Sequence, residues 1–227
     1  MGQLRLLNHL FEIRTMNVGS NAIIYGVVHN DMQQADEVIQ HALSKFDTKK
    51  KTVFLGEGGD PNNVYPRGSE SEYIYEKLKR EFSNLLNDSW DGKDFDVTDP
   101  DSFVFSAIQR LTGYDQDLVN AGIYAAMVGQ GQDPIEVSRL LNKRGKDVLR
   151  SFGVQDAKNP SNEDIQIMYD LCFPQDTGKP AQQISKITDA FNEVRDKNLI
   201  RKVNKYSSLG YQVIACAGES HLDLLQN

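Results

Sequence analysis

Two segments of the chain share a spacing in which a glycine is followed three residues later by a histidine. They are Gly26-Val27-Val28-His29 and Gly218-Glu219-Ser220-His221, and each closes an apolar run. Glu57, within Gly56-Glu57-Gly58, follows a third apolar run. Two imidazoles and one carboxylate are a common ligand set for a catalytic divalent cation, because they leave positions open for water and substrate. We therefore predict that His29, Glu57 and His221 share one site.

Two mechanisms fit these groups. A bound Mn, Co or Zn ion would polarise a carbonyl group and lower the pKa of a bound water to about 7. Without an ion, one imidazole could act as general base while the carboxylate orients it. The residues leave both mechanisms open, and both predict hydrolysis.

Further residues are expected to support this chemistry. Arg195, on a helix that leads into the last apolar run, is expected to stabilise an oxyanion or to hold a substrate carboxylate. Glu219 and Asp60 are candidates for proton transfer or for support of the reacting groups. Gly26 and Gly218 have no side chain, so another backbone or a ligand can approach them closely.

Taken singly, these residues have simpler interpretations. A histidine at a strand end is more often structural or exposed than catalytic, and Glu57 among glycines could be a turn carboxylate. Arg195 on an amphipathic helix could be solvated or salt-bridged. The case for a site therefore depends on the context that these residues share.

The elements that must position these residues follow from the hydrophobic pattern. Apolar runs at residues 22–28, 52–55 and 211–217 predict buried strands. Residues 11–16 precede the first run across a short turn, and a helical pattern over about residues 33–46 follows it. This order predicts a β-hairpin and then a crossover helix that leads to a parallel strand. Side chains that follow parallel strands are expected to converge at the carboxyl edge of the sheet.

The middle of the chain shows helical patterns almost throughout. We expect helices at about residues 73–86, 103–112, 116–129 and 134–152, and a long helix at 181–208. No strand is expected between residues 69 and 153. The predicted architecture is thus one α/β domain over residues 1–227, with a central mixed sheet flanked by helices and a mostly helical insertion at about 66–180. The sequence ends shortly after His221, which suggests a domain excised from a longer protein.

Charge and composition exclude some classes of function. With 39% hydrophobic residues among 227, the chain is expected to fold as a globular unit. It has 25 basic and 32 acidic residues and a net charge of -7, and its basic residues are dispersed apart from a run at 49–51. Binding to the phosphates of nucleic acid is therefore not expected.

The sequence also bears on compartment. No apolar stretch reaches the ~20 residues that span a bilayer, and the first residues lack the apolar core of a signal peptide. We expect no membrane insertion, and a location in the cytoplasm or delivery into a host cytosol as part of a larger protein. Cys172 and Cys216 cannot form a disulfide framework and lack metal-ligand spacing, so both are expected to be reduced and structural.

Taken in order, the motifs resemble the superfamily that contains erythromycin esterases, ChaN-like haem-uptake lipoproteins, TraB/GumN proteins and Tiki metalloproteases. Its pattern has a strand ending in Gly-x-x-His, a strand ending in Glu, a late helix with an Arg-Asp/Asn-x-x-Met-like signature, and a final Gly-x-x-His-Leu. The third motif corresponds here to Arg195-Asp196-Lys197-Asn198-Leu199, with Leu in place of the usual Met. The resemblance covers residues 22–60 and 195–222.

This resemblance implies a mixed α/β fold whose site lies at the strand ends. It implies that His29, Glu57, Arg195 and His221 line that site. Members of the superfamily are esterases, metal-dependent peptidases or haem binders, and degenerate copies occur inside large bacterial toxins. The resemblance therefore locates a site better than it defines an activity.

Three functions remain open on this basis. The first is a hydrolase of ester or peptide bonds, acting on a small-molecule or peptide substrate through water activated by His29, His221 and Glu57, with or without a divalent metal. The second is a binding module for haem, with histidines as axial ligands, or for an anionic ligand. The third is a non-catalytic domain of a larger bacterial toxin or effector. The sequence does not indicate an oligomeric state.

Overall fold

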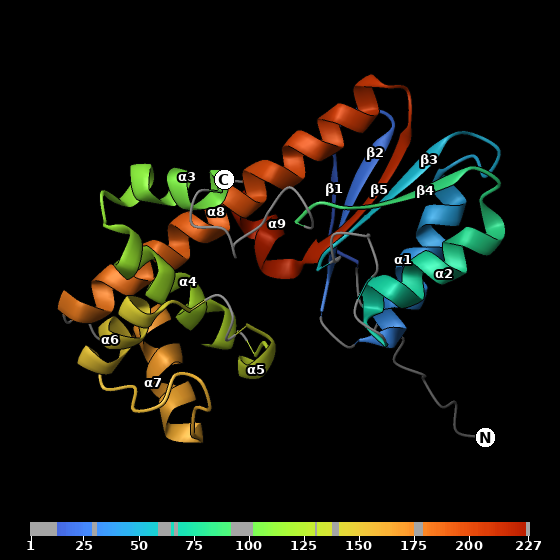
Figure 1. Cartoon of the computed structure of the whole chain (residues 1–227). Helices are drawn as coiled ribbons and strands as arrows, with labels where there is room; N and C mark the ends of the chain where they lie inside the picture. The colour runs from blue at the N-terminus through green and yellow to red at the C-terminus, as the bar shows by residue number, and fades with distance from the viewer. Residues whose placement is uncertain are drawn as a thin grey trace, which may run out of the picture. The chain divides into compact units, whose positions relative to one another are not determined.

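In the computed structural model the chain divides into two compact units. The first is formed by Met1–Lys93 with Leu199–Asn227, and the second by Asp94–Asn198. Figure 1 shows the first unit as a sheet with its helices and the second as a group of helices. The structure describes residues 13–28, 31–58, 65, 68–91, 102–129, 131–137, 141–174 and 179–225.

Within the described residues, the first unit contains a mixed five-stranded sheet. Its strands are β1 (Thr15–Asn17), β2 (Ala22–Val27), β3 (Thr52–Gly56), β4 (Leu85–Ser89) and β5 (Gln212–Gly218). They lie in the order β1-β2-β5-β3-β4. β1 is antiparallel to β2, and the other neighbours are parallel. The predicted α/β fold with a central mixed sheet is confirmed, as is the opening hairpin.

The central strands are apolar because both faces of the sheet are covered. Ile23, Tyr25 and Val27 pack on one face against α1 (Met32–Lys45) and α2 (Glu70–Glu81). Ala22 and Ile24 face the other side, where they belong to a cluster with residues of α8 (Lys179–Ser208) and α9 (Glu219–Leu225). Strands buried on both faces read as continuous apolar runs, which is why the sequence pattern identified them.

The crossover helix α1 begins at a side-chain cap. The carboxylate of Asp31 accepts hydrogen bonds from the backbone N–H groups of Gln33 and Gln34, which satisfies donors that a helix start leaves unpaired. The buried face of α1 includes Ala35 and Val38, in agreement with the predicted helical spacing. α1 joins β2 to β3, which are parallel near neighbours separated by β5.

β4 corrects the prediction that no strand lies between residues 69 and 153. The helix expected at 73–86 ends instead at Glu81, and residues 85–89 form the parallel edge strand. Its sequence, Leu-Leu-Asn-Asp-Ser, carries no apolar alternation because its polar side chains make hydrogen bonds in place of apolar contacts. Hydrophobic periodicity cannot identify such a strand.

All described elements of the second unit are helices. They are α3 (Phe103–Thr112), α4 (Gln116–Gly129), α5 (Pro134–Val137), α6 (Lys143–Ser151), α7 (Asn162–Cys172) and the part of α8 before Leu199. A Cβ atom on Gly122 would lie 2.6 Å from Ile187, so this glycine lets α4 and α8 pack closely. The helix expected at 134–152 is two helices, and Asn142 caps the second.

The expected insertion at about 66–180 thus covers parts of both units. α2 and β4 belong to the sheet unit, and the second unit begins at Asp94 and ends at Asn198. In the part of the chain that the structure describes, no helix is both long and apolar enough to cross a membrane.

A buried ion pair attaches the end of α8 to β4. The ammonium group of Lys202, 5% exposed, lies 3.2 Å from Oδ1 of Asp88 and also donates to the carbonyl oxygen of Ser89 at 2.5 Å. The hydroxyl group of Tyr206, one turn further along α8, donates to Oδ2 of Asp88. These bonds satisfy the buried charge, so polar contacts hold the edge strand in addition to the apolar packing of Leu85.

Replacement of Lys202 by methionine should therefore destabilise the first unit by about 3 kcal/mol, because it leaves the Asp88 carboxylate without its buried cation. Trp90 is the chain's sole tryptophan and belongs to this unit, so urea unfolding followed by tryptophan emission measures the stability of the unit. Lys205→Met removes an exposed lysine from the same helix and should cost less than about 0.5 kcal/mol. Equal stabilities for the two variants would contradict the role given to Lys202.

Candidate functional site

The parallel strands β2, β5, β3 and β4 all end at one side of the sheet, called here the carboxyl edge. α1 and α2, which follow β2 and β3, pack on one face of the sheet, whereas Leu222 of α9, which follows β5, packs on the opposite face. After the neighbouring strands β2 and β5, the chain thus continues toward opposite faces of the sheet. Open α/β sheets bind ligands at such switch points.

Glu57 follows β3 at this edge, and its carboxylate reaches across to β5. Oε2 of Glu57 accepts a hydrogen bond of 2.9 Å from the backbone N–H of Gly218. Oε1 lies 3.9 Å from Nε2 of His221, and the two side chains are 13% and 7% exposed. The structure therefore brings together two of the residues that the sequence motifs had singled out.

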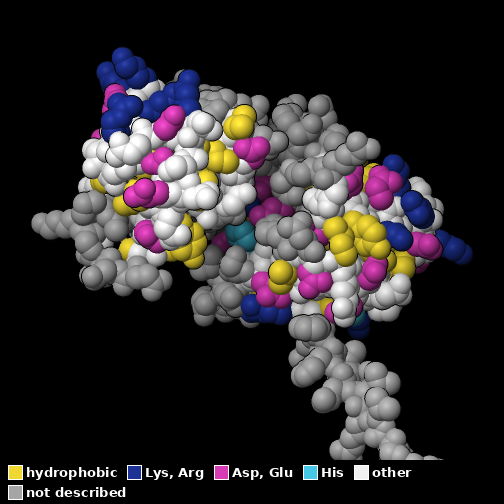
Figure 2. Space-filling view, turned by 90° about the horizontal axis from the view of Figure 1, so that it is seen from below, with side chains coloured by type: hydrophobic (Ala, Val, Ile, Leu, Met, Phe, Trp, Pro, Cys, Tyr) yellow, Lys and Arg dark blue, Asp and Glu magenta, His cyan; other side chains and the backbone are white. Residues whose placement is uncertain are grey.

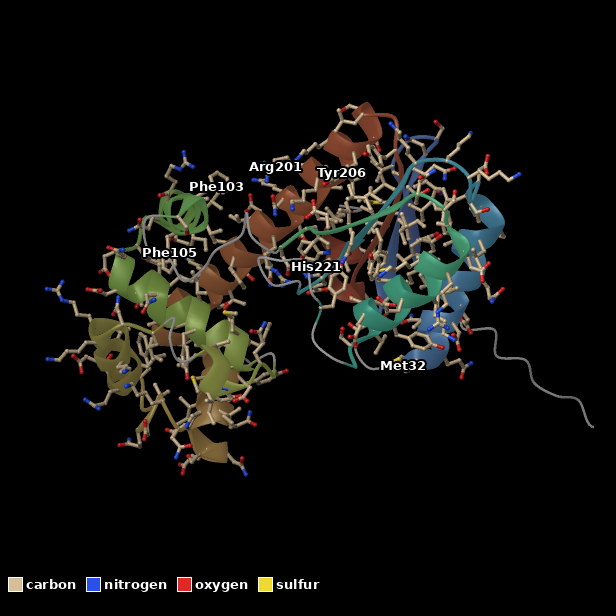
Figure 3. All side chains as sticks on the ribbon, turned by 45° about the vertical axis from the view of Figure 1, so that its right-hand side comes forward. Met32, Phe103, Phe105, Arg201, Tyr206 and His221 are labelled. Atoms are coloured by element: carbon tan, nitrogen blue, oxygen red, sulfur yellow. The ribbon has the colours of Figure 1, made fainter. Side chains whose placement is uncertain are left out.

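His221 lies in the first turn of α9, directly after β5. Figure 3 labels it near the start of that helix. Its ring packs edge-on against Trp90, with 5.4 Å between the ring centroids. The indole N–H of Trp90 donates to the carbonyl oxygen of Cys216 at 2.8 Å, which fixes the ring on β5. The imidazole thus contacts an indole ring and has a carboxylate near its Nε2 atom.

Gly26 permits the position of α9. A Cβ atom on Gly26 would lie 2.7 Å from Cδ1 of Leu222 and 3.4 Å from Cα of Glu219. The close approach expected at this glycine is therefore made by the first turn of α9, which carries His221. Gly218, the equivalent residue in the second motif, donates its N–H to Glu57.

Glu219 takes part in a bridge between β2 and α9. Oε1 of Glu219 accepts from the side-chain amide of Gln34, 3.1 Å away, and the amide oxygen of Gln34 accepts from the backbone N–H of Val28 at 2.5 Å. The buried Gln34 side chain therefore links the end of β2 to the start of α9. This geometry gives Glu219 a supporting contact at the edge.

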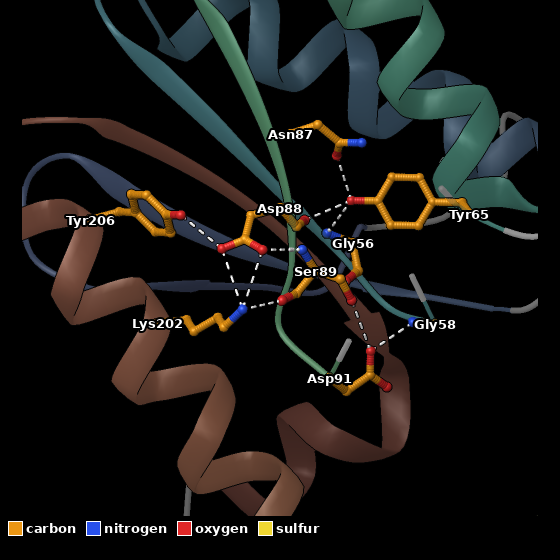
Figure 4. A network of polar contacts seen from close by, with 9 residues as sticks. All are labelled: Gly56, Gly58, Tyr65, Asn87, Asp88, Ser89, Asp91, Lys202 and Tyr206. Atoms are coloured by element: carbon orange, nitrogen blue, oxygen red, sulfur yellow. Dashed lines mark hydrogen bonds and ion pairs between the residues drawn. The ribbon is translucent and has the colours of Figure 1, made fainter. Parts of the chain in front are cut away.

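Three residues at the end of β4 also belong to the site, and sequence reasoning missed them. Ser89, Trp90 and Asp91 lie in a segment, Asp88-Ser89-Trp90-Asp91-Gly92, that resembles a break between helices. Figure 4 shows Asp91 bonded to Ser89 and to the backbone N–H of Gly58. The signal in the sequence that could have indicated these residues is the sole tryptophan, which lies among acidic residues.

Burial sets the protonation of two nearby groups. It raises the pKa of the Cys216 thiol, and the negative charges of Glu70 and Glu57 raise it further. Burial also raises the pKa of the Tyr65 phenol, although a hydrogen bond from the backbone N–H of Gly56 acts in the opposite direction. Both shifts favour the protonated thiol and phenol at neutral pH.

Other predicted site residues are placed differently. His29 and Asp60 lie outside the described residues. Arg195 belongs to the second unit, where its guanidinium lies 5.7 Å from the centroid of the Phe191 ring, and its expected place beside Glu57 stays a prediction. The described residues contain no group of three or more His, Cys, Asp or Glu side chains that could hold a metal ion.

The Glu57–His221 pair can act on a small group placed between its two atoms. A separation of 3.9 Å is too long for a direct hydrogen bond. It is compatible with a bridging water. Zn bonds of about 2.0–2.2 Å at a tetrahedral angle would place the two atoms closer together, at about 3.4 Å. The carboxylate of Glu57 beside Nε2 of His221 favours a cation over an anion. Figure 2 shows one face of the molecule, on which a histidine (cyan) is visible near acidic side chains (magenta).

Comparisons of the chain with models of protein families, with curated proteins and with solved structures find no match. The resemblance carried by the paired Gly-x-x-His motifs therefore stays a prediction.

Gly26→Ala should displace the start of α9. The added methyl group meets the Leu222 side chain and the backbone of Glu219, and overpacking of this kind costs about 1–3 kcal/mol. We expect lower stability together with a shift in Trp90 emission, because His221 moves relative to the indole ring. Unfolding in urea and emission spectra of the native protein measure the two effects. An unchanged emission spectrum would show that α9 keeps its position.

Both cysteines should resist alkylation in the native protein. Cys216 is fully buried, and burial raises the pKa of Cys172 to about 11, whereas alkylation requires an accessible thiolate. Mass spectrometry after iodoacetamide treatment at pH 8 should show no modification in buffer and two modified cysteines in urea. Modification of Cys216 in buffer would contradict the burial of this edge.

Proposed function

We propose that the chain is a hydrolase that activates water at the carboxyl edge of its sheet. The observation that supports this proposal is the pair formed by Glu57 and His221, with 3.9 Å between Oε1 and Nε2 and little exposure of either side chain. The bond that it cleaves is an ester or peptide bond in a small-molecule or peptide substrate. An imidazole and a carboxylate at this spacing can bind one water and remove its proton.

The two side chains have different roles in this proposal. His221 takes the proton of the water at Nε2, the ring atom nearer to Glu57. Glu57 is held by the N–H of Gly218, so its other oxygen keeps its direction toward the imidazole. A fixed donor–acceptor pair of this kind contributes about 10²–10⁴-fold to a hydrolysis rate.

A divalent ion, Mn, Co or Zn, fits the chemistry of these donors. Nitrogen and carboxylate oxygen ligands suit such ions, and Glu57 and His221 supply one of each. His29 is proposed as the third ligand. When bound, the ion would polarise the scissile carbonyl and lower the pKa of water. Gly218 holds Glu57, and Trp90 packs against His221.

Other residues complete the proposal. Arg195 stabilises the oxyanion or anchors an anionic group of the substrate. Asp60 supports proton transfer. Glu219, bonded to Gln34, holds the first turn of α9 in place and so orients His221.

The negative charge beside His221 argues against the two binding alternatives. An anionic ligand would be repelled by Glu57, and an imidazole that binds haem through Nε2 would have this carboxylate at its binding atom. The non-catalytic alternative, a domain of a larger toxin or effector, predicts that changes at Glu57 and His221 leave function unaltered.

The test uses Glu57→Gln and His221→Asn, which remove the charge and the base with little change in shape. Nitrophenyl esters and fluorogenic peptides serve as substrates, after chelation and again after addition of Mn, Co or Zn. We expect kcat/KM to fall at least ~100-fold in both variants. Glu81→Gln changes the same residue type as Glu57, at an exposed position on α2, and should keep normal activity.

Two outcomes would overturn the proposal. One is a native protein that hydrolyses none of these substrates with any ion, and the other is equal activity in the site variants and the control. A Soret band on titration with haem that is lost in His221→Asn would support the haem-binding alternative instead.

A further inference from the structure

We propose that Asp91 is a positioning residue for Glu57, and that the end of β4 acts as a clamp on the residues that flank Glu57. The clamp is defined as Ser89, Trp90 and Asp91. This inference rests on the proposed function, because it concerns the residue to which that function gives a central role. It assigns a role to residues that no sequence motif had indicated.

The clamp contacts the chain on both sides of Glu57. On one side, the backbone N–H of Trp90 and the hydroxyl group of Ser89 both lie 3.2 Å from the carbonyl oxygen of Gly56. On the other side, Oδ1 of Asp91 accepts from the backbone N–H of Gly58 at 2.7 Å. Glu57 thus lies between Gly56 and Gly58, and the backbone groups of both glycines are hydrogen-bonded to the clamp (Figure 4).

The contact with Gly58 matters most, because it fixes a turn. Gly58 has φ of 76°, in the left-handed region that glycine adopts without strain, and it is exposed. Apolar packing cannot hold an exposed glycine. A hydrogen bond to a side chain held from within the fold can do so, and Asp91 is itself within 3.1 Å of the buried hydroxyl group of Ser89.

The clamp is anchored from the side of α8. The ammonium group of Lys202 donates to the carbonyl oxygen of Ser89, and it is also paired with Asp88 (Figure 4). The same segment contacts the second reacting group, since Trp90 packs on His221 and donates to Cys216. Movement of Asp91 should therefore change the position of Glu57 relative to Gly218 and His221.

A second hydrogen bond reports on this position without any assay of activity. The backbone N–H of Gly218 donates to Oε2 of Glu57, so its exchange with solvent depends on where that carboxylate lies. The N–H of Gly58 reports on the Asp91 contact in the same way. The two amides belong to different strand ends, and a change at both is the result expected if Asp91 positions Glu57.

The experiment measures amide exchange at Gly58 and Gly218 by NMR in Asp91→Ala, Asp91→Asn and Asp47→Ala. In Asp91→Ala both amides should exchange about tenfold faster or more, because each loses a hydrogen bond. Asp91→Asn keeps an oxygen acceptor and should restore both rates to within about threefold of normal. Asp47 accepts from Lys49 in a turn before β3, and Asp47→Ala should leave both rates unchanged.

Kinetics separate this inference from the proposed function. If the native protein hydrolyses an ester, kcat should fall about tenfold in Asp91→Ala with KM unchanged, and Asp91→Asn should recover it. If the native protein hydrolyses nothing, the proposed function fails, but exchange at Gly218 still decides whether Asp91 positions Glu57.

Faster exchange at Gly58 alone, with Gly218 unchanged, would overturn the inference, since Asp91 would then hold only the turn. Failure of Asp91→Asn to restore exchange at either amide would also overturn it. If Asp91→Ala does not fold, Ser89→Ala provides the second test, because it removes the hydroxyl beside both Asp91 and Gly56. Ser89→Ala should accelerate the exchange of both amides, and an unchanged exchange rate at Gly218 would count against the clamp.

Discussion

The insertion of β5 between β2 and β3 is the constraint on which the rest of the first unit depends. β5 pairs with β2 so that Gly218 lies opposite Val27, and with β3 so that Ala215 lies opposite Leu55. These two registers determine where β5 ends. Only at that point does the N–H of Gly218 meet the carboxylate of Glu57, and only then does α9 begin beside Gly26. The site is therefore a consequence of strand register.

This edge of the sheet is stabilised by polar contacts, which are costly to bury. Lys202, Asp88 and Ser89 lie where apolar side chains would contribute more stability, and each needs a partner to offset its desolvation. Hydrogen bonds have directions, whereas apolar packing does not. The polar network thus gives the end of β4 a defined geometry, and Trp90 and Asp91 transmit it to His221 and Gly58.

The sequence predicts those parts of this arrangement that rest on repeated apolar contacts. The central strands are recognisable because both faces are buried, and α1 because of its spacing and its Asp31 cap. The prediction that polar residues after parallel strands converge at one edge of the sheet agrees with the positions of Glu57 and His221. The sequence did not predict β4, because each of its polar side chains forms hydrogen bonds with a different residue: Tyr65, Lys202 or Gly56. These partners are distant in sequence, so they leave no local pattern.

Trp90 and Glu57 contribute to the environment of His221. The imidazole contacts the indole ring of Trp90, which offers no group that could accept a proton from it and whose N–H is bonded to Cys216. Its Nε2 atom lies 3.9 Å from Oε1 of Glu57. In the proposed hydrolase, His221 takes its proton at Nε2, and a water or ion near this atom and Glu57 is the group on which it acts. The indole ring restricts the imidazole, and the carboxylate lies near the ring atom that the proposed reaction uses.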